Sequence, residues 1–191
     1  MDIKLINITK KFDEKIILAG FNGCIEMGKT TCIMGASGSG KTTLLRIMMG
    51  LLTPDDGSVE GLTHLKKSVV FQEDRLCENL TVATNIKMVS RQILDKGQLL
   101  EAVEKIGLPL NCLNQAVGQL SGGQKRRVAI LRALFADYDI LLLDEPFKGL
   151  DLETKIDTMS FVKELTRKKT VILVTHDESE CLAMEGKLIT L

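Results

Sequence analysis

The stretch Gly35-Ala36-Ser37-Gly38-Ser39-Gly40-Lys41-Thr42 is the part of the sequence that decides the fold. It fits the pattern G-x-x-x-x-G-K-[ST] and stands between a β-branched run, residues 30–34, and a helix-forming run, residues 42–49. Glycines permit positive φ and let backbone amides converge on a phosphate, and a helix N-terminus adds partial positive charge. The stretch predicts a phosphate-binding loop in which Lys41 reaches the β- and γ-phosphates and the Thr42 hydroxyl ligates Mg²⁺.

The composition is that of a single soluble domain. The chain has 191 residues, with 25 basic and 25 acidic side chains and a pI near 6.7. Without a basic field, nucleic acid is not expected as a partner. The N-terminus lacks the layout of a signal peptide, and the longest purely apolar run, residues 140–143, is far shorter than the roughly 20 residues that cross a bilayer. Any membrane role is therefore expected to come through a partner.

Strand and helix patterns alternate along the chain, which predicts a mostly parallel sheet covered on both sides. The apolar run that ends at Leu143 is typical of a central parallel strand buried on both faces. From about residue 81 to 119 the pattern is helical but broken by glycine and proline, which predicts a small helical lobe. We expect one α/β domain over residues 1–191, with a core of approximately 1–80 and 120–191 and a helical subdomain of approximately 81–119.

Polar side chains follow several of the predicted strands. Asp144 ends the buried strand, where an Asp of a phosphate-binding-loop protein holds Mg²⁺, and Glu145 is placed to act as general base on an attacking water. His176 ends another strand and is placed to donate to a γ-phosphate. Gln72 follows the strand at 68–71, where a neutral amide can touch the metal or the water. We expect these groups at the carboxyl edge of the sheet, where ligands bind in such folds.

A second anion-binding surface is predicted at Leu120-Ser121-Gly122-Gly123-Gln124. Ser121 is expected to cap the helix that follows, because its hydroxyl can accept a hydrogen bond from a free amide. The helix start then offers amides and a dipole to an anion. This surface is expected to be too far from Lys41 to touch the same nucleotide. The arrangement therefore predicts two copies of the chain with ATP between them.

The ordered motifs resemble the nucleotide-binding subunit of ABC transporters over nearly the whole chain. Residues 35–42 look like its Walker A motif, residues 120–124 are its LSGGQ signature unchanged, and residues 140–145 are similar to Walker B with the catalytic glutamate. Gln72 matches the Q-loop, His176 the switch histidine, and residues 149–151 the D-loop. Phe12 falls where the family places an aromatic that stacks on adenine, although the usual residue there is Tyr.

The resemblance implies a RecA-like P-loop fold with an N-terminal antiparallel β subdomain and an inserted helical subdomain. It also implies ATP hydrolysis, with ATP and Mg²⁺ as cofactors. The residues carried over as catalytic are Glu145, His176, Lys41 and Gln72, and those carried over as metal ligands are Thr42, Gln72 and Asp144. The residues expected to bind the nucleotide are Phe12, Gly35, Ala36, Ser37, Gly38, Ser39, Gly40, Lys41, Thr42, Thr43, Ser121, Gly122, Gly123, Gln124 and Asp151.

The partners implied are a second copy in a head-to-tail dimer, transmembrane permease subunits and, for an importer, a substrate-binding protein. The subunit would be cytoplasmic and peripheral on the inner face of the membrane. The segments at residues 72–76 and 145–151 are similar to ATPases of importers for nitrate, sulfonate, taurine and related small anions. The chain ends soon after His176, so regulation through a C-terminal domain is not expected.

Other readings of the motifs stay open. An ABC-type ATPase of chromosomes or DNA repair would carry long coiled-coil arms between the P-loop and the signature, and no heptad run occurs between Gln72 and Leu120. ABC-type translation factors have two cassettes, whereas this chain has one. A cassette that serves cofactor assembly without a membrane pore would share all the motifs. A P-loop kinase of small molecules would explain Lys41 but not the signature.

Overall fold

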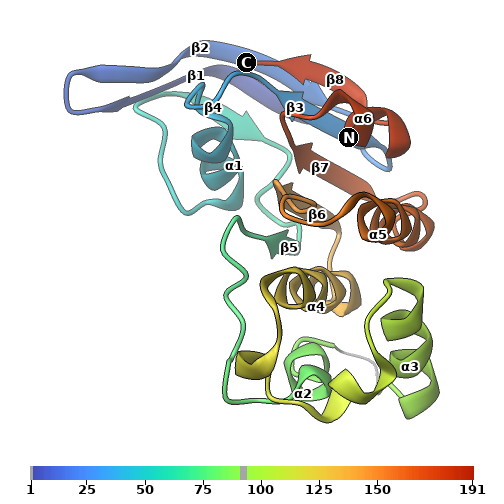
Figure 1. Ribbon diagram of the computed structural model, residues 1–191. Coiled ribbons are helices and arrows are strands. Elements are labelled where there is room, and N and C mark those ends of the chain that lie inside the picture. The colour runs from blue at the N-terminus through green and yellow to red at the C-terminus, as the bar shows by residue number, and fades with distance from the viewer. Residues whose placement is uncertain (1, 91–93) are drawn as a thin grey trace.

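The computed structural model describes residues 2–90 and 94–191, and at its centre is a five-stranded parallel sheet (Figure 1). The strand order is β5-β6-β7-β3-β8, and every neighbouring pair is parallel. The expected mostly parallel α/β sheet is therefore confirmed. Its strands are β3 (Thr30–Met34), β5 (Lys67–Val70), β6 (Ile140–Asp144), β7 (Thr170–Val174) and β8 (Lys187–Thr190).

Strand β6 divides the interior into two hydrophobic cores. All five of its residues are buried. Because side chains alternate along a strand, Ile140 and Leu142 pack into one core, whereas Leu141 and Leu143 pack into the other. The continuous apolar run read from the sequence is thus the consequence of covering both faces of the sheet.

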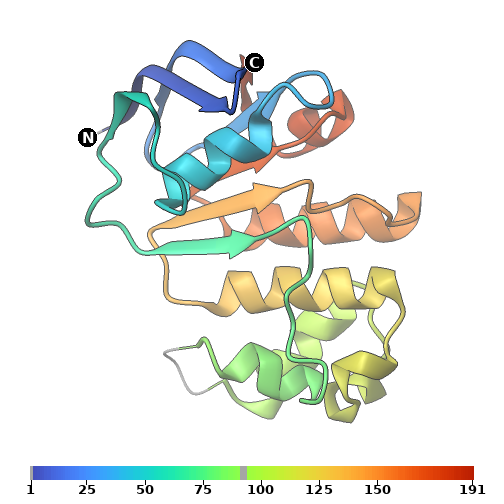
Figure 2. The ribbon, with the colours of Figure 1, turned by 90° about the vertical axis from the view of Figure 1, so that its left-hand side faces the viewer.

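One face of the parallel sheet is covered by a helix and a second, antiparallel sheet. Figure 2 shows helix α1 (Lys41–Met49) between the two sheets, where its buried Leu44 and Leu45 share a core with β6. The antiparallel sheet has the order β2-β1-β4. Its strands are β1 (Ile3–Phe12), β2 (Lys15–Ile25) and β4 (Asp56–Glu60).

The sequence Pro54-Asp55-Asp56-Gly57 predicts a turn, but the second half of this prediction is wrong, because β4 begins at Asp56. Gly57 has a φ of 86°, and a Cβ there would run into the Ile6 and Asn7 backbone of β1. Glycine at this position permits a close approach between strands. From the sequence pattern alone, the glycine predicts a turn.

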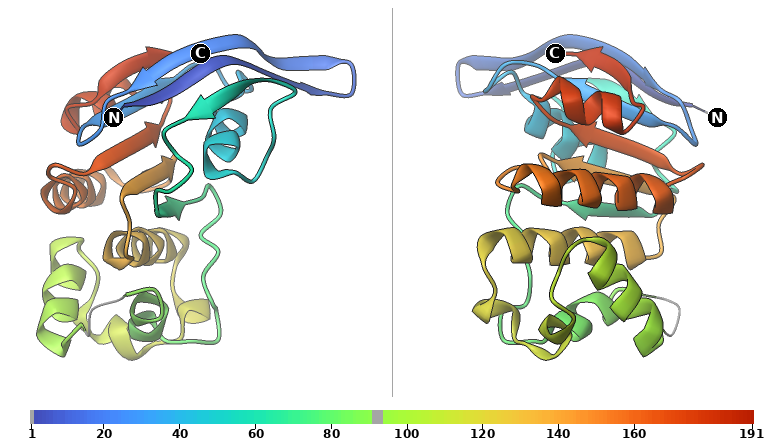
Figure 3. Two further views of the ribbon diagram at one scale, coloured as in Figure 1. Left: turned by 180° about the vertical axis from the view of Figure 1, so that it is seen from behind. Right: turned by 45° about the vertical axis from the view of Figure 1, so that its right-hand side comes forward.

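The other face is covered by α4 (Gly122–Phe135), α5 (Leu152–Leu165) and α6 (Glu178–Ala183). Beyond α4 lies a helical lobe, which Figure 3 shows at the end of the molecule opposite the antiparallel sheet. Its elements are α2 (Val82–Lys87), α3 (Lys96–Lys105) and two 3-10 helices, η1 (Leu110–Asn114) and η2 (Val117–Gln119). None of the helices in the described ranges is both long enough and apolar enough to span a bilayer.

Helix ends differ from the predicted ones by a few residues. The sequence pattern is helical over residues 81–90 and over about 153–168, whereas α2 ends at Lys87 and α5 ends at Leu165. The 3-10 helices occupy the stretch in which glycine and proline interrupt the helical pattern. The division of the chain into a core and an inserted subdomain at residues 81–119 stays a prediction.

Replacing Leu141 by Ala should lower the free energy of unfolding by about 2–5 kcal/mol, because it leaves a cavity in the core beneath the parallel sheet. Urea denaturation of purified protein measures the change. The matched control is Leu182→Ala, whose side chain is 77% exposed and whose loss should cost within about 0.5 kcal/mol. Equal losses in the two variants would contradict the assignment of β6 as a doubly covered strand.

Candidate functional site

The predicted phosphate-binding loop joins the end of β3 to the start of α1. Gly38 and Gly40 have φ angles of 79° and 99°, which only glycine adopts without strain. A Cβ at Gly40 would lie 2.9 Å from side-chain atoms of Ile17 and Leu18 on β2. Glycine is therefore required there both by the backbone conformation and by the close approach of the antiparallel sheet.

The lysine of the loop is held against its own backbone. Lys41 is 6% exposed, and its Nζ donates to the carbonyl oxygens of Gly35 at 2.7 Å and Ala36 at 2.8 Å. The Ser39 hydroxyl is buried and has no hydrogen-bond partner within the described part of the chain. A buried polar group without a partner is costly, so a bound phosphate with its several acceptor oxygens fits this loop.

Thr42 and Asp144 lie next to each other across the gap between α1 and β6. The Thr42 hydroxyl donates to Asp144 Oδ1 at 3.3 Å. Asp144 is 2% exposed, and burial raises the pKa of its carboxyl group above the usual range. A hydroxyl and a carboxylate are the oxygen donors that Mg²⁺ prefers, and a cation would offset the cost of burying the charge. These two residues therefore fit the expected metal.

A cavity of about 400 Å³ joins the loop to three other elements. It brings Phe12, Gln72 and Glu145 to the same space as Lys41, although they come from different parts of the chain, and Thr43 of α1 also lines it. Phe12 lies at the tip of the β1–β2 hairpin and is 46% exposed. Its ring is therefore accessible for stacking on a nucleotide base. The further lining residues are Lys15, Ile17, Ser37, Gly38, Gly40, Thr42 and Lys148.

Glu145 has a backbone conformation that is rare for a non-glycine residue, with a φ of 46°. Its N–H donates to Val174 O on β7 at 2.9 Å, and its carbonyl accepts a hydrogen bond from Arg126 Nη2 at 3.3 Å. Two neighbouring elements thus hold the peptide groups on both sides of the Glu145 Cα, and these orient the carboxylate. Residues in such strained conformations cluster at functional sites, because the surrounding structure must hold them there.

The Glu145 carboxylate lies between two nitrogen-bearing side chains. His176 Nδ1 is 3.4 Å from Oε1, and Lys148 Nζ is 3.1 Å from Oε2. Burial by itself raises the pKa of Glu145, but the contacts with Lys148 and His176 outweigh burial and lower the pKa below its ordinary value. Glu145 is therefore a carboxylate at neutral pH, which is the form that can accept a proton from water.

His176 extends from an anchored turn that follows β7. Thr175 donates to Glu180 Oε2 at 2.6 Å, and Lys155 pairs with Asp177 at 2.6 Å. The histidine side chain itself is 61% exposed and lines a neighbouring cavity of about 190 Å³ rather than the cavity of Lys41. It reaches the candidate site through its contact with Glu145.

The signature residues form a separate surface. The Ser121 hydroxyl accepts from Gln124 N at 3.3 Å and the Gln124 side chain accepts from Ser121 N at 2.9 Å, so the two residues form a capping box and the predicted helix cap is confirmed. Gly122 and Gly123 line a third cavity of about 390 Å³. None of these four residues lines the cavity of Lys41.

Asp151 also caps a helix instead of facing the cavity of Lys41. Its Oδ1 accepts from Thr154 N at 3.0 Å at the start of α5, and this hydrogen bond is the main reason why the pKa of Asp151 is lowered. Asp151 does not line the cavity of Lys41, and its role in nucleotide binding stays a prediction.

Three lining residues escaped the sequence reading. Lys15 lies opposite Phe12 in the hairpin register, so a prediction of that register would have placed it beside the cavity. Ile17 follows on the same strand. Lys148 stands three residues after Glu145, but its contact with the carboxylate depends on the positive φ of Glu145, which no sequence pattern indicates.

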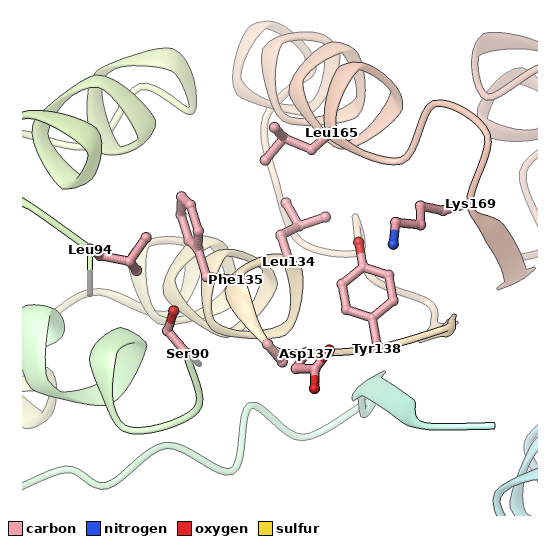
Figure 4. A pocket seen from close by; sticks show the side chains of 9 residues that line it. Ser90, Leu94, Leu134, Phe135, Asp137, Tyr138, Leu165 and Lys169 are labelled. Atoms are coloured by element: carbon pink, nitrogen blue, oxygen red, sulfur yellow. The ribbon is translucent and has the colours of Figure 1, made fainter. Parts of the chain in front are cut away.

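A different cavity, of about 300 Å³, lies at the far end of α4 (Figure 4). Two of its lining residues, Tyr138 and Lys169, lie one or two residues before β6 and β7 begin. Ligands of parallel sheets bind at the carboxyl ends of the strands, which is the opposite edge. Burial raises the pKa of Tyr138 to about 12, so the phenol stays neutral. We assign this cavity no role in the chemistry above.

The fold and the cavity of Lys41 together define a P-loop nucleoside triphosphatase. The profile of the ABC transporter family matches residues 18–148. The chain is 36% identical to the aliphatic sulfonates import ATP-binding protein SsuB 1 of Agrobacterium fabrum, over 97% of this chain and 69% of that protein. It is 35% identical to the spermidine/putrescine import ATP-binding protein PotA of Acetivibrio thermocellus, over 99% of this chain and 58% of that protein.

A solved structure supports the same family assignment as these relatives. A dimeric structure of the ATP-binding cassette MJ0796, in a post-hydrolysis state with ADP and Pi, superimposes with a TM-score of 0.83 at 34% identity. The superposition covers 99% of this chain and 94% of that one. The chain therefore belongs to the ABC transporter family, and as one of its ATP-binding cassettes it is an ATPase that uses ATP and Mg²⁺.

Replacing Lys41 by Met should weaken ATP binding about 10- to 100-fold, because the nucleotide loses charge-assisted hydrogen bonds to its phosphates. Titration with a fluorescent ATP analogue in the presence of Mg²⁺ measures the dissociation constant. The control is Lys29→Met, which removes an exposed lysine just before β3 begins and should change affinity less than about twofold. Equal affinities for the two variants would show that the loop is not the phosphate site.

Proposed function

We propose that this chain powers an importer of small molecules by hydrolysing ATP between two copies of itself. The observation that carries the proposal is that the P-loop residues and the signature glycines of one chain line two different cavities. The P-loop cavity holds Lys41, while the signature glycines line another cavity at the start of α4. A head-to-tail dimer would bring the signature of one copy onto the phosphates held by the other, so that each ATP contacts both chains.

Glu145 is the proposed general base for hydrolysis. Its carboxylate takes a proton from water as the water oxygen attacks the γ-phosphorus, and the bond between that phosphorus and ADP breaks. Lys41 and His176 neutralise charge on the transferring phosphoryl group, and Gln72 orients the water. Phe12 stacks on the adenine, while backbone amides of residues 35–43 hold the phosphates.

Thr42 and Asp144, with Gln72 nearby, would hold Mg²⁺. The ion supplies positive charge that stabilises the β- and γ-phosphate oxygens. Ser121, Gly122, Gly123 and Gln124 of the second copy contribute the remaining contacts, and Asp151 lies at the junction between the copies. Loss of the γ-phosphate removes contacts from both chains at once, which favours opening of the dimer.

Opening and closing of the dimer would drive permease subunits in the membrane, with the chain bound on their cytoplasmic face. The proposed cargo is a small anion of the sulfonate type, because relatives such as SsuB 1 of Agrobacterium fabrum carry that name and the segments near Gln72 and Glu145 are similar to such ATPases. A substrate-binding protein would deliver the cargo from outside.

Glu145→Gln should bind ATP and dimerise but hydrolyse ATP at least about 100-fold more slowly, because the amide cannot accept the proton of the attacking water. Size-exclusion chromatography with Mg²⁺ and ATP measures the dimer, and phosphate release measures turnover. Glu104→Gln, which alters an exposed carboxylate on α3, should behave as wild type. A Glu145→Gln protein that stays monomeric with ATP bound would rule out the sandwich dimer.

The role in transport is tested in membranes. Chain expressed with an affinity tag in its native host should co-purify from detergent-solubilised membranes with a polytopic integral protein, and Mg-ATP turnover of the complex should rise when the cargo and its binding protein are added. If only soluble partners co-purify, the chain is instead an ABC-type ATPase of cofactor assembly.

A further inference from the structure

One buried arginine joins three parts of the candidate site. Arg126, on α4, is 6% exposed and has four partners. Its Nη1 donates to Phe71 O at 2.6 Å and lies 3.1 Å from Asp74 Oδ1. Its Nη2 donates to Gln72 O at 2.9 Å and to Glu145 O at 3.3 Å.

The accepting carbonyls lie where two neighbouring strands end. Strand β5 ends at Val70 and β6 ends at Asp144, so the carbonyl oxygens of Gln72 and Glu145 lie beyond the paired residues of these two strands. These part-buried carbonyls accept hydrogen bonds from a single guanidinium, which supplies its donors with fixed geometry. The distance between the water-orienting amide and the general base is thereby set through one side chain.

The same arginine stands in the second turn of the helix that begins with the signature. Gly122 and Gly123 open this helix, and they line one cavity together with Arg126, Gln72 and Asp74. A helix moves as a rigid body over so short a length. A shift of the signature therefore moves Arg126, and with it the carbonyls of Gln72 and Glu145.

We propose that Arg126 is a positioning residue that couples the signature helix to Gln72 and Glu145 of the same chain. This inference rests on the proposed dimer, in which the signature contacts the nucleotide of the other copy. Occupancy of the partner's nucleotide site is then communicated to the general base of this chain. Both Nη atoms of Arg126 are engaged by three carbonyl oxygens and Asp74, so its effect is on the rate of hydrolysis and on the coupling of the two sites rather than on ATP affinity.

Arg132 is a matched control on the same helix. It donates to the carbonyls of Arg75 at 2.8 Å and Asp74 at 3.2 Å, so it also anchors the loop that follows β5. Within residues 2–90 and 94–191, its hydrogen bonds go to these two carbonyls and not to Gln72 or Glu145. An arginine that merely anchors the loop and one that positions the two catalytic segments can therefore be compared directly.

The test compares Arg126→Met, Arg126→Lys and Arg132→Met with wild type. Steady-state Mg-ATP hydrolysis gives kcat and the Hill coefficient, titration with a fluorescent ATP analogue gives the dissociation constant, and thermal denaturation shows that each variant is folded. We expect Arg126→Met to lower kcat about 10- to 100-fold and to bring the Hill coefficient close to one, with ATP affinity changed less than about threefold. Arg126→Lys keeps the positive charge but loses the planar guanidinium with its several fixed donors. Its kcat should lie between those of Arg126→Met and wild type.

Arg132→Met should lose thermal stability but keep kcat within about threefold of wild type. Equal losses of kcat in Arg126→Met and Arg132→Met, or a loss confined to ATP affinity, would overturn the inference while leaving the proposed function intact. If Arg126→Met fails to fold, a kcat of Arg126→Lys equal to wild type overturns the inference as well. Absence of turnover in wild-type protein would overturn the proposed function and this inference together.

Discussion

The candidate site depends on one constraint, which is that four parallel strands end at the same edge of one sheet. Strand β3 leads into the P-loop, β5 into Gln72, β6 into Glu145 and β7 into His176. Each strand is held in register by hydrogen bonds to its neighbours, so groups that are remote in the sequence meet within a few ångströms. The rest of the molecule supports this edge: two hydrophobic cores cover the sheet, and the β1–β2 hairpin carries Phe12 to the cavity.

The strand ends are held by specific polar contacts as well as by the sheet. Glu145 adopts a positive φ, and hydrogen bonds with Val174 and Arg126 hold the peptide groups that precede and follow its Cα. The turn that carries His176 is anchored by buried partners on α5 and α6. Backbone strain and buried charge both cost free energy, so their presence here is best explained by the chemistry they permit.

Much of this arrangement could be predicted from the sequence, because the relevant features are local. The P-loop pattern, the apolar run of β6 and the Ser121 cap each depend on a few adjacent residues. The features that escaped prediction depend on long-range geometry. Strand β4 was hidden because Gly57 approaches β1, the contact of Lys148 requires the backbone strain at Glu145, and the partners of Arg126 lie on two different strands. Hydrophobic periodicity carries no information about such contacts.

The central claim is that each active site is built from two chains. It is tested most directly by mixing two variants that are each inactive, Lys41→Met and Gly122→Asp. A Cβ at Gly122 meets no atom within 4 Å, so the aspartate is tolerated by the fold but places a negative charge where the partner's phosphate is expected. In a mixed dimer one site combines an intact P-loop with an intact signature. The account predicts Mg-ATP hydrolysis in the mixture that neither variant shows alone, whereas full activity of Gly122→Asp by itself would contradict it.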